Sequence, residues 1–142
     1  MNDRERGSTL PLVIGFFALG TLVAAGAVAA GDAFVQQRGL QAVCDGAALA
    51  AAAGSADLDR AADVAESGEL RFSSAEAAVA DYLARDPGRR EVQAMTTTSV
   101  DERTIEVRCV EVRPVTFGAL FGRPRGIRHV VRSSARAPLS PP

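Results

Sequence analysis

The stretch LPLVIGFFALGTLVAAGAVAAG, from Leu10 to Gly31, decides the organisation of this chain. It carries no charge, and Thr21 is its only polar side chain. As a helix it is about 33 Å long, which is enough to cross the hydrocarbon core of a bilayer. The residues beyond it are polar enough to form a soluble domain. The sequence therefore predicts a tail at 1–9, a transmembrane helix at 10–31, an extracytoplasmic domain at 32–136 and a disordered tail at 137–142.

Two interpretations of the apolar run are open. In the first it is a retained helix with a cytoplasmic N-terminus, because Arg4 and Arg6 precede it and no basic residue follows before Arg38. In the second it is a secretory signal peptide, cleaved at the small residues Ala27-Val28-Ala29. We favour retention because the helical pattern continues beyond Gly31. The expected location is then the cell membrane, crossed once, with the C-terminal domain outside.

Small residues recur along the run at helical spacing. Gly20 and Ala24 form one pair with three residues between them, and Ala27 and Gly31 form another. Such pairs let helices approach closely in lipid, so we expect these four residues to form a helix-packing surface. The alternative is that an alanine-rich sequence contains such pairs by chance.

Beyond Gly31 the helical pattern continues to about Ala53, and Gly54-Ser55 is expected to end it. Its apolar face is predicted to hold Leu40, Val43, Cys44, Ala47, Ala50 and Ala51. A second, acidic helix is predicted over Asp57–Glu66. A capping box at Ser73 is expected to open a third helix that runs to about Arg85, with Val79, Tyr82 and Leu83 buried.

After Asp86-Pro87-Gly88 the period changes to two, which is typical of strands with one solvated face. Strands are predicted over 92–100, 105–112 and 127–135, with a turn at 101–103. A phase slip near Cys109 and Val110 predicts a bulge there. Together with the helices, this predicts an α+β fold with a three-stranded antiparallel sheet. Between the last two strands, the apolar segment Val115–Gly122 either caps the sheet or contacts a partner.

The composition excludes several function classes. The net charge is −1, so the chain has no footprint for nucleic acid. Cys44 and the single histidine, His129, would form a catalytic pair only by accident of folding, and His129 is expected to be a hydrogen-bonded core residue. The serines at 73, 74, 133 and 134 have no evident base, and no phosphate loop or metal-ligand cluster occurs. We therefore expect no enzyme activity, cofactor, metal or small-molecule substrate.

The chain contains two cysteines, Cys44 and Cys109. In an oxidising compartment a disulfide between them is expected, whereas the alternative is two buried free thiols. Closing so long a loop would contribute roughly 4 kcal/mol in the chain-entropy description. That contribution is large for a small, aromatic-poor core.

The N-terminal third resembles the TadE/TadG-like family of Flp (Tad) pilus-assembly proteins. An Arg-Gly-Ser start at Gly7 precedes the apolar run, and a second motif follows it. The matching positions of that motif are Leu40, Gln41, Asp45, Ala47, Ala48, Leu49 and Ala50. The arginine-only basic composition and the cysteine pair indicate an actinobacterial version of the family.

The resemblance implies a minor structural or assembly component of a Tad/Flp-type pilus or secretion machine, with other membrane proteins of that machine as partners. Pilin-like relatives carry a glutamate five residues after the glycine that prepilin peptidase recognises, and Leu12 stands at that position here. The non-processed, TadG-like branch therefore fits better than a cleaved pilin. The alternative function is a small secreted binding module or effector released by signal peptidase.

Overall fold

The computed structural model describes residues 9–61, 68–98 and 104–136. In chain order the elements are helix α1 (Thr9–Ala61), helix α2 (Gly68–Ala84), the short 3₁₀ helix η1 (Pro87–Arg89) and strands β1 (Gln93–Thr98), β2 (Thr104–Arg113) and β3 (Ile127–Arg136). The predicted α+β fold is confirmed. The tails at 1–8 and 137–142 and the turn expected at 101–103 lie outside the described residues.

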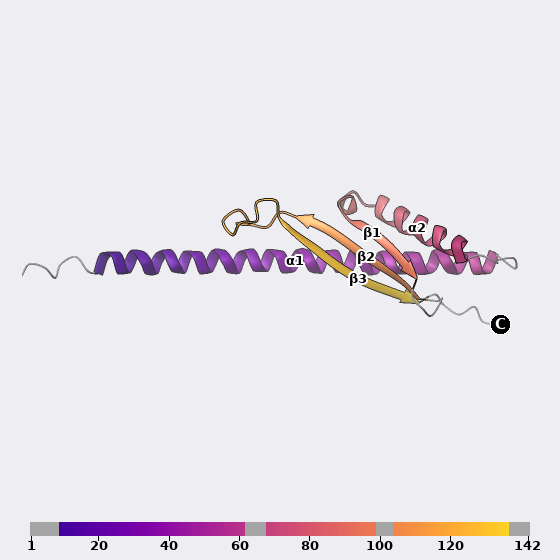
Figure 1. The fold of residues 1–142 in the computed structure, drawn as a ribbon, viewed down its shortest axis with the longest axis horizontal. Helices are drawn as coiled ribbons and strands as arrows, with labels where there is room; N and C mark the ends of the chain where they lie inside the picture. The colour runs from indigo at the N-terminus through magenta and orange to yellow at the C-terminus, as the bar shows by residue number, and fades with distance from the viewer. Residues whose placement is uncertain (1–8, 62–67, 99–103, 137–142) are drawn as a thin grey trace, which may run out of the picture.

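Helix α1 runs the length of the molecule, and the sheet and α2 cover only its C-terminal half (Figure 1). At 53 residues it is longer than predicted, and its expected end at Gly54-Ser55 is wrong. Gly54 instead lies where α2 crosses closely, since a Cβ there would come within 2.9 Å of the Ala78 Cβ. The buried Ser55 hydroxyl donates to the Ala52 carbonyl at 2.8 Å, so this serine remains within the helix. The acidic helix expected from Asp57 therefore begins inside α1, and its remainder, 62–66, lies outside the described residues.

Helix α2 begins at Gly68, so the expected start at Ser73 is wrong. Helical hydrogen bonds extend N-terminally of the capping-box serine because an interior serine costs a helix only a fraction of a kcal/mol. The expected break is confirmed: α2 ends at Ala84, and the Asp86 side chain accepts a 2.9 Å hydrogen bond from the Gly88 amide at the start of η1.

The sheet is antiparallel with the order β1-β2-β3. On β3 the expected alternation is confirmed, with His129 and Val131 buried and the arginines at 128, 132 and 136 exposed. Gly126 closes the β2–β3 connection with φ +89°, where a Cβ would collide with the Arg113 carbonyl oxygen.

The bulge expected near Cys109 and Val110 is absent. Pairing of β2 with both neighbours is continuous through these residues. The inward position that follows Cys109 is Glu111, which is only 3% exposed, whereas Val112 faces outward and is 52% exposed. The Glu111 carboxylate accepts a 2.6 Å hydrogen bond from the Arg113 Nε. This charge-assisted pairing lets a carboxylate occupy a position where the sequence pattern anticipates an apolar residue.

The core lies between α1, α2 and the inner face of the sheet. It is built largely from small side chains, and its largest fully buried members are Leu40, Val107, Cys44 and Cys109. The structure contains the disulfide between Cys44 on α1 and Cys109 on β2, with Cα atoms 5.8 Å apart. This bond joins the long helix to the central strand of the sheet.

We expect Cys44→Ser and Cys109→Ser each to lower the free energy of unfolding by roughly 2–5 kcal/mol, because either change releases the same long loop in the unfolded chain. The double variant should cost little more than either single one. Denaturant unfolding of the full chain in detergent micelles measures these differences. Alkylation of two thiols in unreduced, denatured protein would contradict the bridge itself.

Candidate functional site

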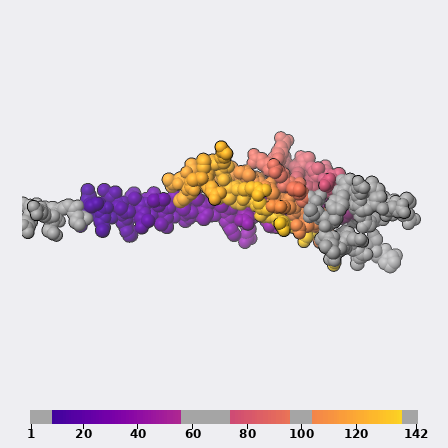
Figure 2. Space-filling model, viewed as in Figure 1, coloured from indigo at the N-terminus to yellow at the C-terminus, as the bar shows by residue number. Residues whose placement is uncertain are grey.

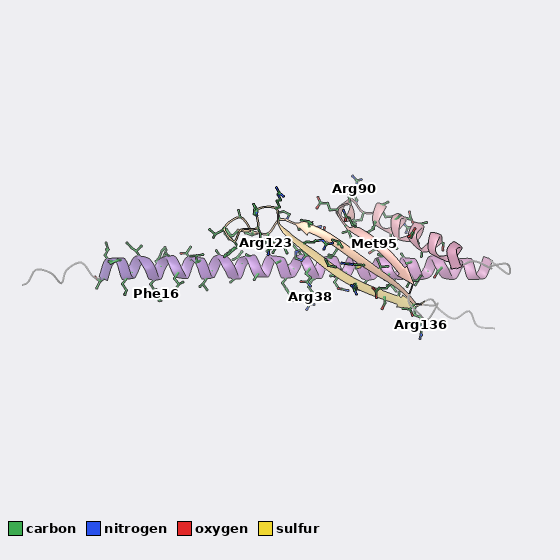
Figure 3. All side chains as sticks on the ribbon, in the orientation of Figure 1. Phe16, Arg38, Arg90, Met95, Arg123 and Arg136 are labelled. Atoms are coloured by element: carbon green, nitrogen blue, oxygen red, sulfur yellow. A yellow bond between two sulfur atoms is a disulfide. The ribbon has the colours of Figure 1, made fainter. Side chains whose placement is uncertain are left out.

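The N-terminal part of α1, from Thr9 to Ala24, is bare. Every residue of this stretch is exposed, and Figure 2 shows that this end of the helix stands clear of the domain. Its large side chains include Phe16, which is 79% exposed, and Phe17, which is 77% exposed. Figure 3 shows Phe16 on a stretch of helix with no other element beside it. Among the described residues, this one helix is long and apolar enough to cross a membrane, and no part of its most apolar window is buried in the protein. So large an exposed apolar surface marks an interaction surface.

The four small residues Gly20, Ala24, Ala27 and Gly31 are all exposed. At 3.6 residues per turn they lie roughly 150° around α1 from the face that contacts the domain. A Cβ built at Gly20 or Gly31 would meet no atom within 4 Å. The small-residue stripe is therefore open along its length and points away from the sheet.

The apolar segment Val115–Gly122 lies beside α1, between the bare helix and the sheet (Figure 1). Val115 is buried, with only 9% of its surface exposed. A Cβ built at Gly26 would lie 3.7 Å from the Phe121 ring. Between helix and segment is an almost wholly apolar groove of about 180 Å³, lined on the helix side by Gly26, Ala29, Ala30 and Ala33. The segment thus covers one side of the helix just where the bare stretch ends.

Asp32 fastens this segment to α1. Its carboxylate accepts hydrogen bonds from the Thr116 amide and the Thr116 hydroxyl, both at 2.8 Å, and from the Gln36 side chain at 3.1 Å. Gln36 also donates to the Pro114 carbonyl at 2.9 Å. The Thr116 backbone and side-chain hydrogen bonds hold the pKa of Asp32 below its ordinary value of 3.8, so the carboxylate is ionised at neutral pH.

A second polar contact lies further along α1. Asp45 accepts a 2.9 Å hydrogen bond from Gln41 and a 2.6 Å hydrogen bond from the Ser133 hydroxyl of β3. Of the other motif positions, Leu40, Ala47 and Ala48 are buried, Ala50 is half-buried and Leu49 is 66% exposed. In this chain Asp45 of the motif therefore joins the helix to the sheet, while Gln41 bonds Asp45 within the helix, and the small residues of the motif let helix and sheet pack closely.

The residues considered for catalysis are not assembled into a site. Cys44 is held in the disulfide, which removes it as a nucleophile. His129 is buried as expected, but its Nε2 has no hydrogen-bond partner among the described residues, so the expectation of a fully hydrogen-bonded histidine is wrong. Within the described ranges, no group of three or more His, Cys, Asp or Glu residues is arranged to hold a metal ion.

The residues that sequence reasoning missed are the ones that position the domain on α1. Asp32 is the first charge after the apolar run, but its partner Thr116 lies 84 residues away. Nothing in the local pattern links the two. The hydrogen bond between Ser133 and Asp45, which are 88 residues apart, could not be predicted from the local sequence pattern either.

Residues 7–54 match the model of a family described as putative Flp pilus-assembly TadE/G-like. The resemblance predicted from the sequence is confirmed over this segment, which includes the bare stretch of α1 and the motif that follows it. The match supports involvement in Flp pilus assembly. Comparisons with curated proteins and with solved structures gave no significant match.

We expect Asp32→Asn to loosen the segment that Asp32 holds, because hydrogen bonds to a carboxylate are about twice as strong as those to a neutral acceptor. Amide hydrogen exchange at Thr116 should be faster in the variant at neutral pH. Folding lowers the pKa of Asp32, so the native protein holds Thr116 more tightly than the variant at every pH above the ordinary pKa of the carboxyl group. This difference between native protein and variant disappears as the pH falls through the lowered pKa, where Asp32 becomes protonated.

Asp45→Asn is the matched control, since Asp45 also lies on α1 but contacts β3 and not the segment. In the Asp45→Asn variant, amide hydrogen exchange at Thr116 should be as slow as in the native protein. Equal Thr116 exchange in native protein and Asp32→Asn at neutral pH would contradict the role given to this carboxylate.

Proposed function

We propose that this TadE/TadG-like chain is a membrane-anchored minor structural or assembly component of a Tad/Flp-type pilus or secretion machine. It acts by association of its helix and its domain with other membrane proteins of that machine, not by catalysis. The observation that carries the proposal is the bare apolar stretch of α1 from Thr9 to Ala24, which falls within the family-matching segment and on which no other described element packs.

The proposed membrane segment is Leu10–Gly31, with the tail before it in the cytoplasm and the folded domain outside. Arg4 and Arg6 before the run support this orientation. The disulfide is also consistent with a domain that folds outside the cytoplasm. Leu12 at the position where pilin-like relatives carry glutamate supports a chain that keeps its N-terminus.

The alternative is a secreted module released by cleavage near Ala30. Cleavage there would remove Gly26 and Ala29, which contact or face the apolar segment. The packing of the segment across the cleavage region therefore supports retention. The mass of the mature N-terminus in membrane and culture fractions distinguishes the two fates.

The orientation is tested by cysteine labelling in intact cells. Cysteines are introduced singly at Asn2 in the tail and at Met95, whose side chain on β1 is 67% exposed. The native cysteines are bonded and do not react. We expect a membrane-impermeant maleimide to label the Met95→Cys variant in intact cells and the Asn2→Cys variant only after lysis. The reverse pattern would refute the orientation.

The helix stripe is tested with Gly20→Leu and Gly31→Leu. Bulk at either position should weaken crosslinking to membrane partners, because close helix approach in lipid requires small residues. Gly15→Leu is the matched control: Gly15 also has no atom within 4 Å of a built Cβ, and it lies on the other side of α1. Crosslinking yields that are equal in all three variants and the native protein would mean that the stripe has no packing role.

A further inference from the structure

The segment 115–122 exposes large apolar side chains that its packing on α1 does not account for. Phe117 is 52% exposed, Leu120 is 62% exposed and Phe121 is 44% exposed. All three lie in one short segment. Val115 and Gly118, by contrast, are buried and hold the segment against the helix.

The position of the segment along α1 fixes its depth once the helix is placed in a membrane, and in this respect the inference rests on the proposed function. From Leu10 to Gly26 the helix rises about 24 Å, which is less than the roughly 30 Å of a hydrocarbon core. Phe121 lies against Gly26. The end of the segment at Phe121 therefore reaches the outer-leaflet side of the hydrocarbon core.

The backbone of the segment is suited to that depth. The amides of Gly118, Leu120, Phe121, Gly122 and Arg123 all donate to carbonyls within residues 115–119, at 2.7–3.2 Å. The Thr116 amide donates to Asp32. Unsatisfied backbone groups make an irregular segment costly in lipid, and these internal hydrogen bonds reduce that cost.

The charges next to the segment complement a lipid surface. Arg123 and Arg125 follow it directly and are exposed, and no described residue forms an ion pair with either (Figure 3 labels Arg123). Arginine side chains keep their stems on apolar surface while the guanidinium reaches lipid phosphates. The apolar groove between the segment and α1, which Arg123 also lines, lies at the same level.

We propose that the segment 115–122 is a second membrane contact. Phe117 and Leu120 insert among the acyl chains of the outer leaflet, and Arg123 and Arg125 bind lipid phosphates above them. The domain is thereby held against the bilayer surface at two points, α1 and this segment, instead of standing free on a single helix.

Tryptophan fluorescence tests this directly, because the native chain contains no tryptophan and a single introduced one reports only its own position. The full-length variants Leu120→Trp and Phe117→Trp are reconstituted into vesicles of phosphatidylcholine and phosphatidylglycerol, with lipids brominated at a shallow acyl position as quenchers. Phe16→Trp reports the membrane helix, and Met95→Trp on β1 reports the domain surface away from the segment. Formation of the disulfide, assayed by thiol alkylation, verifies that each variant is folded.

We expect brominated lipid to quench the Leu120→Trp and Phe117→Trp variants to an extent comparable with Phe16→Trp, while Met95→Trp retains its fluorescence. Quenching of the Phe16→Trp variant alone, with both segment variants left as bright as Met95→Trp, would overturn the second contact and leave the anchor intact. A blue-shifted but unquenched Leu120→Trp emission would also overturn it, because protein and not lipid would then cover the segment. Absence of quenching in the Phe16→Trp variant would overturn both the anchor and this inference.

Discussion

The packing of one face of α1 against the inner face of the sheet is the contact on which the rest of the structure depends. That face is made mainly of small residues, with Leu40 and Cys44 as its larger members. Small side chains allow the helix and sheet to approach closely, but each removes little apolar surface from water. The disulfide from Cys44 to Cys109 lies within this contact. Its stabilisation of the fold offsets the small hydrophobic contribution of a core with few large side chains.

Polar contacts at two levels fix how the domain sits around α1. Asp32 holds the connection between β2 and β3, and Asp45 holds β3 itself through Ser133. The two carboxylates are 13 residues apart, or about 20 Å along the helix. Two separated attachments oppose rotation of the domain about the helix axis. They keep the small-residue stripe on the side away from the sheet.

An uninterrupted α1 also has a mechanical consequence. The described helix has no break between Thr9 and Ala61, so the bare apolar stretch is continuous with the part of α1 that packs in the domain. A partner that binds the stripe would therefore also set the direction in which the domain faces. In an assembly built by helix association, this coupling determines which surface of the sheet is presented to neighbouring subunits.

The sequence by itself determined the elements whose signal is local. The apolar run predicted the bare helix, the two-residue alternation predicted the strands, and the cysteine pair and the motif around Asp45 were recognisable from their residues alone. Only the tertiary structure decided that α1 continues past Gly54, because this glycine allows α2 to cross closely and does not end the helix. It alone placed Glu111 inward, where its pairing with Arg113 outweighs the apolar pattern of the valines beside it. The attachment of Thr116 to Asp32 was likewise invisible, because periodicity describes the faces of one element and cannot say which distant residue will meet them.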